Sequence, residues 1–264
     1  MATIVYCHAH PDDEASQTSG AMARAAAEGH RVVVVFATTG DHGEIAADAV
    51  EGETVAAYRA REAAASAAVI GLTRVAWLGY ADSGMAGWEQ NDHEHSLHQA
   101  DLDEAAQRLA DVLDEEGADV VVGYDWHGGY GHPDHVKVHH VVRRAVDLAA
   151  QRPRLLESTT NRDEMIRLIA LGREAGLDLE DFDPTQPMDD GNPFGSTEDE
   201  ITWRVDVSAY LDRKRASLEA HRSQATDIEM FLSMPRDVFD LFFGHEHLIE
   251  PDVEGPMREG WPFA

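Results

Sequence analysis

The stretch "TIVYCHAHPDDE" (residues 3–14) decides the fold. Its apolar first part, residues 3–10, is rich in β-branched side chains and predicts a buried strand. Two histidines and three consecutive acids stand at the end of this strand. Ligands of open α/β sheets bind at the carboxyl ends of the strands, so this junction is a candidate site.

Apolar runs and helical patterns alternate along the first half of the chain. Further strands are predicted at residues 31–38, 74–80 and 118–124, and a helix begins at Pro133. Strands separated by single helices pair in parallel through right-handed crossovers. We therefore predict a Rossmann-like, doubly wound, mostly parallel sheet of order 3-2-1-4-5. In that order the first and fourth strands are neighbours at the topological switch point.

The second half of the chain has a looser pattern. It suggests three strands, at 152–160, 201–207 and 245–251. Two helices are predicted at 161–177 and 210–224, and residues 181–199 form a Pro-, Gly- and Asp-rich loop. No repeat or low-complexity linker divides the sequence. We therefore expect one domain over 1–264, with a Rossmann-like core (1–150) and a C-terminal α+β elaboration (151–264) that shapes the pocket.

The composition narrows the class of partner. Fifty acids against 21 bases give a formal charge of -29, and the acids are spread along the chain, as on a solvated acidic surface of a salt-adapted protein. Such a surface repels nucleic acid and anionic membranes, so we expect neither as a partner. We expect a cytoplasmic protein, because no apolar run approaches the ~20 residues of a membrane span. We expect the single cysteine, Cys7, to be a small buried hydrophobic residue. A homo-oligomer is possible as a further partner.

Two similar tetrapeptides follow the two strands expected to be neighbours. "HPDD" (His10–Asp13) follows the first strand, and "HPDH" (His132–His135) follows the fourth. Either motif alone could be a strand-to-helix turn with proline in the first helical turn and acids near the helix dipole. Together they bring histidines and carboxylates to one crevice, which favours a site.

Imidazole and carboxylate are the ligands of a catalytic divalent metal. Three protein ligands leave a position open for water, whose pKa the metal lowers toward ~7. The two motifs offer more donors than three, and a metal hydrolase also needs a general base and an oxyanion partner. Adjacent Asp12 and Asp13 should point in different directions, so that one holds metal while the other faces water. Spacing alone does not assign these roles.

The segments "AHPDDE", "GGYGHPDH", "LGYADSGM" and "AHRSQ" resemble the PIG-L/LmbE-like family of zinc-dependent N-deacetylases. Within that family, the sequence is most similar to the mycothiol-pathway deacetylase and amidase. The resemblance covers residues 3–150 and again about 200–225. It implies hydrolysis of an N-acetylated 2-amino sugar of the N-acetylglucosaminyl type, a small-molecule substrate, with release of acetate and a free amine.

The resemblance also implies a role for each matching residue. Asp12 would be the general base, His132 the group that stabilises the oxyanion or protonates the amine, Tyr130 a mobile side chain that polarises the carbonyl, and Asp134 a residue that tunes His132. The metal ligands would be His10, Asp13 and His135, and the substrate-binding residues Arg59 and Asp82. As alternatives, Arg59 would be a surface helix residue and Asp82 a turn former.

Alternatives remain at the level of function. Zn²⁺ is the expected metal and Fe²⁺ the alternative, since imidazole and carboxylate accept both. A mycothiol-conjugate-type amidase is the nearest other activity. A phosphoesterase would need basic phosphate clamps, and basic residues are scarce. A non-catalytic Rossmann-like binding module is disfavoured, because the first strand lacks G-x-G-x-x-G.

The remaining histidines are expected to be structural or exposed. We interpret His8 as a strand-end packing residue and "HRSQ" at residues 221–224 as structural. We expect surface positions for His93, His95, His98, His245 and His247, the last two sharing one face of a strand.

Overall fold

The computed structural model describes residues 1–43, 52–174, 182–188 and 190–263. The strands are β1 (Thr3–His8), β2 (Arg31–Thr38), β3 (Arg74–Tyr80), β4 (Val120–Tyr124), β5 (Arg154–Thr159), β6 (Trp203–Asp206), β7 (His245–Ile249) and β8 (Arg258–Glu259). The α-helices are α1 (Asp13–Gln17), α2 (Ser19–Ala27), α3 (Val55–Ile70), α4 (Leu102–Glu116), α5 (Pro133–Leu148), α6 (Arg162–Glu174), α7 (Leu211–Ala220), α8 (Ala225–Ser233) and α9 (Arg236–Phe243). No helix in these described stretches is long and apolar enough to cross a membrane.

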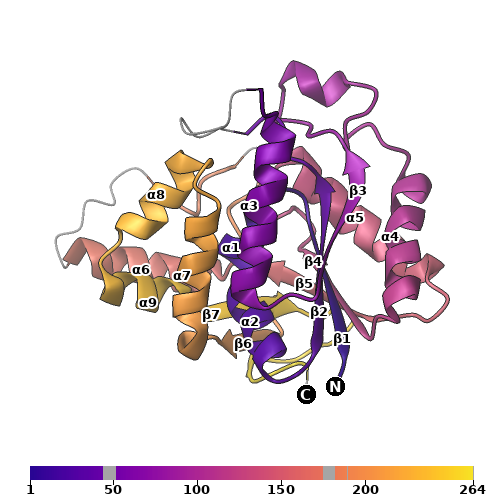
Figure 1. Cartoon of the computed structure of the whole chain (residues 1–264). Helices are drawn as coiled ribbons and strands as arrows, with labels where there is room; N and C mark the ends of the chain where they lie inside the picture. Colours follow the sequence, from indigo (N-terminus) through magenta and orange to yellow (C-terminus); the bar gives the residue numbers. More distant parts are fainter. Residues whose placement is uncertain (44–51, 175–181, 189, 264) are drawn as a thin grey trace.

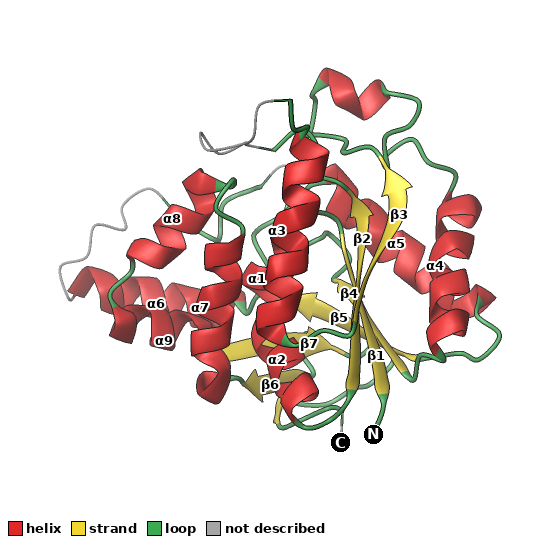
Figure 2. Ribbon diagram, in the orientation of Figure 1, coloured by secondary structure: helices red, strands yellow, loops and turns green. Residues whose placement is uncertain are grey.

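The strands form one mixed sheet of order β3-β2-β1-β4-β5-β7-β6-β8. Pairing is parallel from β3 to β5, and β7 then runs antiparallel to both β5 and β6. The predicted order 3-2-1-4-5 is therefore confirmed, and strands from the C-terminal half extend the same sheet. In Figure 2 the strands fan across the centre of the molecule, with helices on both sides.

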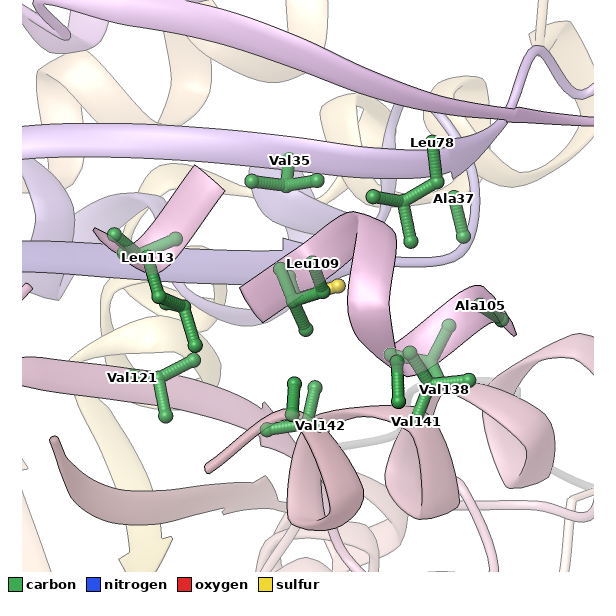
Figure 3. Packing of buried hydrophobic residues seen from close by; sticks show 14 of the residues in the cluster. Val35, Ala37, Leu78, Ala105, Leu109, Leu113, Val121, Val138, Val141 and Val142 are labelled. Carbon is green, nitrogen blue, oxygen red and sulfur yellow. The ribbon is translucent and has the colours of Figure 1, made fainter. Parts of the chain in front are cut away.

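Two apolar layers enclose the parallel part of the sheet. Alternate residues of β1 and β2, such as Val5 and Val35, face α4 and α5, and their neighbours face α2 and α3. Figure 3 shows Leu109 of α4 set between Val35 of β2 and Val142 of α5. Burial on both faces explains why these strands read as continuous apolar runs. Cys7 is buried in the first layer, and burial raises its pKa to about 12, as befits a small hydrophobe.

A third apolar cluster joins the C-terminal helices to the first motif. It packs α7, α8 and α9 against Ala15 of α1 through Leu211, Leu218, Ile228, Phe239 and Phe243. Figure 1 shows α7 lying alongside α3 on the outer side of the molecule. The sequence pattern did not predict α8 and α9. Their packing brings the C-terminal half of the chain to the back of the "HPDD" turn.

The structure differs from the predicted elements at several ends. The first strand stops at His8 rather than His10, because the chain turns to present the motif. The helix expected after it is divided into α1 and α2 at Thr18, whose hydroxyl lies 2.8 Å from Nε2 of His8. The loop over 181–199 contains no helix or strand among its described residues. Part of the helix expected over 161–177, residues 175–177, lies outside the described residues, as does residue 181.

Candidate metal centre and active site

The two histidine motifs meet at the carboxyl ends of β1 and β4. These strands pair in parallel, with Ile4 opposite Val120, so both chains leave the sheet at the same edge. The first motif leads into α1, and the second opens α5 with His132 as N-cap and Pro133 in the first turn. The turn interpretation is correct for the second motif, whereas in the first motif Pro11 precedes the N-cap Asp12 and lies outside the helix; the two motifs converge as predicted.

Three buried histidines form the centre of the site. Nitrogen atoms of His10, His132 and His135 all lie within 4.8 Å of one another. Oδ1 of Asp13 lies 3.3 Å from Nε2 of His135. A second set of donors, His10, Asp82 and Asp134, meets the same distance limit. These side chains form a candidate His/Asp metal site, since imidazole and carboxylate are metal ligands.

His135 has the environment of a metal ligand. Its Nδ1 lies 3.1 Å from the carbonyl oxygen of Gly128, a contact that places the proton on Nδ1. Nε2 then carries a free lone pair, and it is buried without a hydrogen-bond partner. A Cβ on Gly128 would lie 2.3 Å from Cβ of His135, so only glycine allows this approach. A metal ion would satisfy the otherwise orphaned nitrogen, so the residues fit the group.

His132 has the opposite tautomer. Its Nδ1 accepts a hydrogen bond from the backbone N–H of Asp134, at 3.1 Å. Burial, followed by the neighbouring rings of His10 and His135, lowers the pKa of His132 to about 2. The neutral ring must therefore carry its proton on Nε2. That arrangement makes His132 a hydrogen-bond donor within the site.

His10 is oriented by carboxylates at both ring nitrogens. Nε2 lies 3.1 Å from Asp134 and 3.6 Å from Asp82, and Nδ1 lies 3.5 Å from Asp13. Burial lowers the pKa of His10, but these acids outweigh it and hold the pKa well above its ordinary value. The carboxylate of Asp134 also accepts hydrogen bonds from the backbone N–H and hydroxyl of Ser83. Its side chain thus contacts His10, and only its backbone N–H contacts His132.

Tyr124 orients the Asp13 carboxylate, a role that the sequence analysis did not predict. Its hydroxyl donates to Oδ2 of Asp13 at 2.8 Å, and its ring stacks on His135 at 4.4 Å. The backbone N–H of His10 donates to the same carboxylate oxygen. Burial raises the pKa of Asp13, but His135 and His10 reverse the effect and hold it well below the ordinary value. The available signal was a tyrosine at the end of a strand that begins with three valines.

Asp12 stands beside this centre in a strained conformation. Its φ of 117° and ψ of -29° lie in a region that costs a residue with a side chain about 1–3 kcal/mol. Oδ2 of Asp12 lies 3.1 Å from Nη2 of Arg59. Burial raises the pKa of the Asp12 carboxyl to about 6, although Arg59 acts in the opposite direction. A half-buried carboxyl with a pKa near neutrality suits a general base.

Arg59 and Asp82, the predicted substrate contacts, both lie in the site. Arg59 is buried on α3, so the surface-residue alternative is wrong. Its guanidinium also donates to the carbonyl oxygens of Pro11 and Gly40. Asp82 does form a turn, since its carboxylate accepts from the backbone N–H of Gly84, but it also approaches His10.

Tyr130 lies in the glycine-rich loop between β4 and α5. Its ring centroid is 5.1 Å from that of His135 and 6.1 Å from that of His132. On its other side it stacks against Phe194, 6.5 Å away, from the loop over 181–199. The buried carboxylate of Asp125 supports this loop by accepting from the backbone N–H of Gly129. All nine residues predicted for the site thus meet in one place.

The other histidines divide into three groups. His93, His95 and His98 are exposed, as predicted. His8 packs at the end of its strand, within 3.3 Å of the Tyr124 hydroxyl, and burial lowers its pKa to about 4. The surface position predicted for His247 is wrong, because α6 covers this face of β7 and Glu164 lies 3.0 Å from its Nε2.

His245 is less exposed than the predicted surface position implies, whereas His221 was predicted to be structural. His245 is half-buried beside Arg204. His221 is fully buried and contacts Glu14 of the first motif, which accords with a structural interpretation of "HRSQ".

Comparison with known proteins gives strong sequence matches over most of the chain. The chain is 38% identical over 262 residues to 1D-myo-inositol 2-acetamido-2-deoxy-α-D-glucopyranoside deacetylase of Acidothermus cellulolyticus. That match covers 94% of this chain and 88% of the relative. It includes the C-terminal half, for which the sequence patterns were loose.

Solved structures show the same fold at low sequence identity. GalB, the 4-carboxy-2-hydroxymuconate hydratase of Pseudomonas putida, superposes with a TM-score of 0.59 at 17% identity, covering 98% of this chain and 99% of that chain. The zinc-inhibited form of teicoplanin deacetylase Orf2 gives 0.57 at 14% identity, covering 96% and 100%. A hydratase and a deacetylase share the fold, so the fold alone does not assign the activity.

The family assignment rests on sequence. The family described as "PIG-L: GlcNAc-PI de-N-acetylase" matches residues 5–146, which include both histidine motifs. Together with the 38% identity to the Acidothermus deacetylase, this match shows that the chain belongs to the PIG-L family.

Proposed function

We propose that this protein hydrolyses the acetamide of an N-acetylated 2-amino sugar, with N-acetylglucosaminyl-inositol as the first candidate substrate. The observation that carries the proposal is a buried set of His and Asp donors, with Asp12, whose backbone is strained, beside it. The similarity to a deacetylase that acts on such a glycoside supports the choice of substrate. The amidase alternative uses the same site chemistry, and the two differ in the acyl group removed.

The proposed metal ligands are His10, Asp13 and His135. The free lone pair on Nε2 of His135 and the hydrogen-bonded carboxylate of Asp13 support this choice. Asp134 would hold the ring of His10 from the far side, as carboxylates do behind many metal-binding histidines. When bound, Zn²⁺, with Fe²⁺ as the alternative, supplies Lewis-acid chemistry for the attack of water on an amide carbonyl.

Asp12 and His132 would move and hold the protons. Asp12 takes a proton from the attacking water, for which a pKa near 6 is suitable. The Nε2–H of His132 donates to the oxygen of the carbonyl as negative charge develops on it, a contact worth about 3–4 kcal/mol in comparable sites. The proton held by Asp12 then passes to the nitrogen. The C–N bond breaks, and acetate and the free amine leave.

Tyr130, Asp82 and Arg59 would complete the substrate site. Tyr130 lies beside both His132 and His135, where its hydroxyl can assist at the carbonyl. The carboxylate of Asp82 is an acceptor suited to sugar hydroxyls. Arg59 already binds Asp12 and two backbone carbonyls, so any sugar contact would use the same guanidinium.

A substrate panel tests the proposal. Zinc-reconstituted protein is incubated with N-acetylglucosaminyl-inositol, N-acetylglucosamine, a chitin-type disaccharide and a thiol-conjugate amide, and acetate and free amine are measured. We expect acetate from the sugar–inositol substrate and none after chelation of the metal. Stoichiometric zinc without acetate release from any acetamido sugar would contradict the proposed function.

A further inference from the structure

The backbone of Asp12 is held by a group that the proposed mechanism does not use. Its N–H donates to Oε2 of Glu14 at 2.9 Å, which bends the chain back on itself over two residues. Its carbonyl accepts from Ala15 and Ser16 in the first turn of α1. Since φ at this residue is 117°, the surrounding contacts must maintain a conformation that an L-residue rarely adopts.

Glu14 is itself fixed from two other helices. It is 1% exposed, and its Oε1 accepts from the hydroxyl of Ser66 in α3 at 2.5 Å and lies 2.7 Å from Nε2 of His221. His221 stands at the C-terminal end of α7 and is fully buried. Ser66 is linked in turn to Ser217 of α7 at 2.8 Å. The carboxylate is therefore clamped between α3 and α7, directly behind the first motif.

A purely structural role does not account for this pair. Burying an acid and a histidine costs desolvation free energy, and apolar side chains of similar volume would fill the space at least as well. Besides its contacts with Ser66 and His221, the carboxylate accepts the backbone N–H of Asp12, which an apolar side chain could not do. Arg59 restrains the carboxylate of Asp12 and donates to the carbonyl oxygen of Pro11, on the other side of the peptide bond whose N–H Glu14 holds.

We propose that Glu14 and His221 are positioning residues, which hold the strained backbone of Asp12 so that its carboxylate faces the metal centre. The inference rests on the proposed function, since it takes Asp12 as the base. It also gives the C-terminal half of the chain a part in the site, because α7 carries His221 there. Asp13 has its own hydrogen bonds, from Tyr124 and the backbone of His10, so it can keep its place when Glu14 is lost.

Variants of Glu14 test the proposal against a matched control. Glu14→Ala removes the acceptor for the Asp12 N–H, whereas Glu14→Gln keeps one acceptor oxygen. The control is Glu246→Ala, another buried carboxylate that accepts two backbone N–H groups, those of Gly20 and Ala21, and pairs with Lys214 of α7. Glu246 contacts no atom of Asp12, so it reports the cost of losing a buried acid alone.

We expect kcat of Glu14→Ala to fall about 100-fold, with KM within threefold of wild type and about one zinc per chain by elemental analysis. Glu14→Gln should recover to within about tenfold of wild type. His221→Gln should fall between the two. Glu246→Ala should lower the melting temperature by a similar amount and leave kcat unchanged. In a crystal structure of Glu14→Ala, φ of Asp12 should become negative.

Several results would overturn the inference. For Glu14→Ala, these are wild-type kcat in folded, zinc-loaded protein, a rise in KM alone, or a loss of activity that only follows the loss of zinc. An equal fall in kcat in Glu246→Ala would also overturn it. If Glu14→Ala does not fold, wild-type kcat in folded, zinc-loaded His221→Gln would have the same meaning. If wild-type protein releases no acetate from any sugar, the proposed function fails, and φ of Asp12 in the Glu14 variants still decides the positioning role.

Discussion

The two neighbouring aspartates of the proposed site have different surroundings, which suit the different roles proposed for them. Asp13 accepts hydrogen bonds from Tyr124 and from the backbone of His10, and it faces His135, so its charge is strongly stabilised. Asp12 is half-buried beside one cation, Arg59, and burial raises its pKa to about 6. The two side chains contact different groups, Arg59 for Asp12 and His135 for Asp13. A ligand and a base can therefore occupy consecutive positions.

Asp12→Asn should abolish nearly all turnover while the protein keeps its metal and fold. An amide cannot accept a proton at neutral pH, and we expect kcat to fall by at least ~1000-fold, the scale typical of a lost general base. Acetate release and zinc content are the measurements, with His135→Ala as the contrasting variant that loses zinc. Wild-type kcat in zinc-loaded Asp12→Asn, or normal zinc content in His135→Ala, would show that these roles are assigned wrongly.

At the scale of elements, the antiparallel strands β6 and β7 extend the sheet beyond the parallel core. Strand alternation puts His245 and His247 on one face and Glu246 on the other, as the sequence pattern predicted. The face with His247 meets α6, where Glu164 contacts both His247 and Arg204. The opposite face meets α2, where Glu246 binds the first helical turn. Each face of β7 thus anchors one helix through a carboxylate.

Glu164→Gln should weaken the fold in a pH-dependent way. The contact with His247, followed by that with Arg204, lowers the pKa of Glu164 from 4.5 to about 2. A depressed pKa stabilises the protein above the unfolded-state value, and this contribution is lost as pH falls from about 4.5 to 2. We expect Glu164→Gln to lower the free energy of unfolding by about 1 kcal/mol at pH 7, a modest effect because the carboxylate is partly solvated.

Urea unfolding of wild type and Glu164→Gln at pH 7 and pH 3.5 measures this effect. The difference in the free energy of unfolding between the two proteins should be smaller at pH 3.5 than at pH 7. Glu198→Gln, which removes an exposed ion pair with Arg167 of the same helix, is the matched control and should change stability by less than about 0.5 kcal/mol. A difference that is constant with pH would show that Glu164 acts through packing alone.

At the scale of the whole molecule, charge is the dominant feature. A net charge of -29 on 264 residues makes the folded surface repel itself, and this repulsion opposes the compact state. Many arginines are held in surface ion pairs, such as Arg144 with Asp103 and Arg152 with Asp147. Such pairs contribute little individually. The acidic surface is therefore a stability cost at low ionic strength.

Salt should stabilise this protein. Raising NaCl from 0.05 to 1 M shortens the screening length to about 3 Å, and we expect the melting temperature to rise by about 5 °C. Scanning calorimetry is the measurement. A variant with Glu89→Gln, Asp92→Asn and Glu254→Gln, all at exposed positions, should respond less to salt. An equal response in both proteins would show that salt acts on apolar hydration instead of charge repulsion.

The periodicity of the sequence accounts for the sheet but not for the C-terminal helices. Runs such as residues 31–38 are buried on both faces, and their β-branched side chains identify them as parallel strands. Helices α8 and α9 are short and follow α7 closely, and their apolar residues are buried only when α7 and α1 pack against them. His247 was misplaced for the same reason, since α6 covers it from a distant part of the chain.

By itself the sequence determined the order of the parallel strands and the meeting of the two histidine motifs, since both depend on local pattern and on short motifs at strand ends. The nine predicted site residues followed from the family resemblance that these motifs carry. Only the tertiary structure decided which ring nitrogen carries the proton in His132 and His135. It also decided that Arg59 binds Asp12 and that Tyr124, Glu14 and His221 support the two aspartates. Hydrogen bonds between residues up to 207 positions apart create these features. No local pattern encodes such contacts, because their partners meet only when the helices and strands pack.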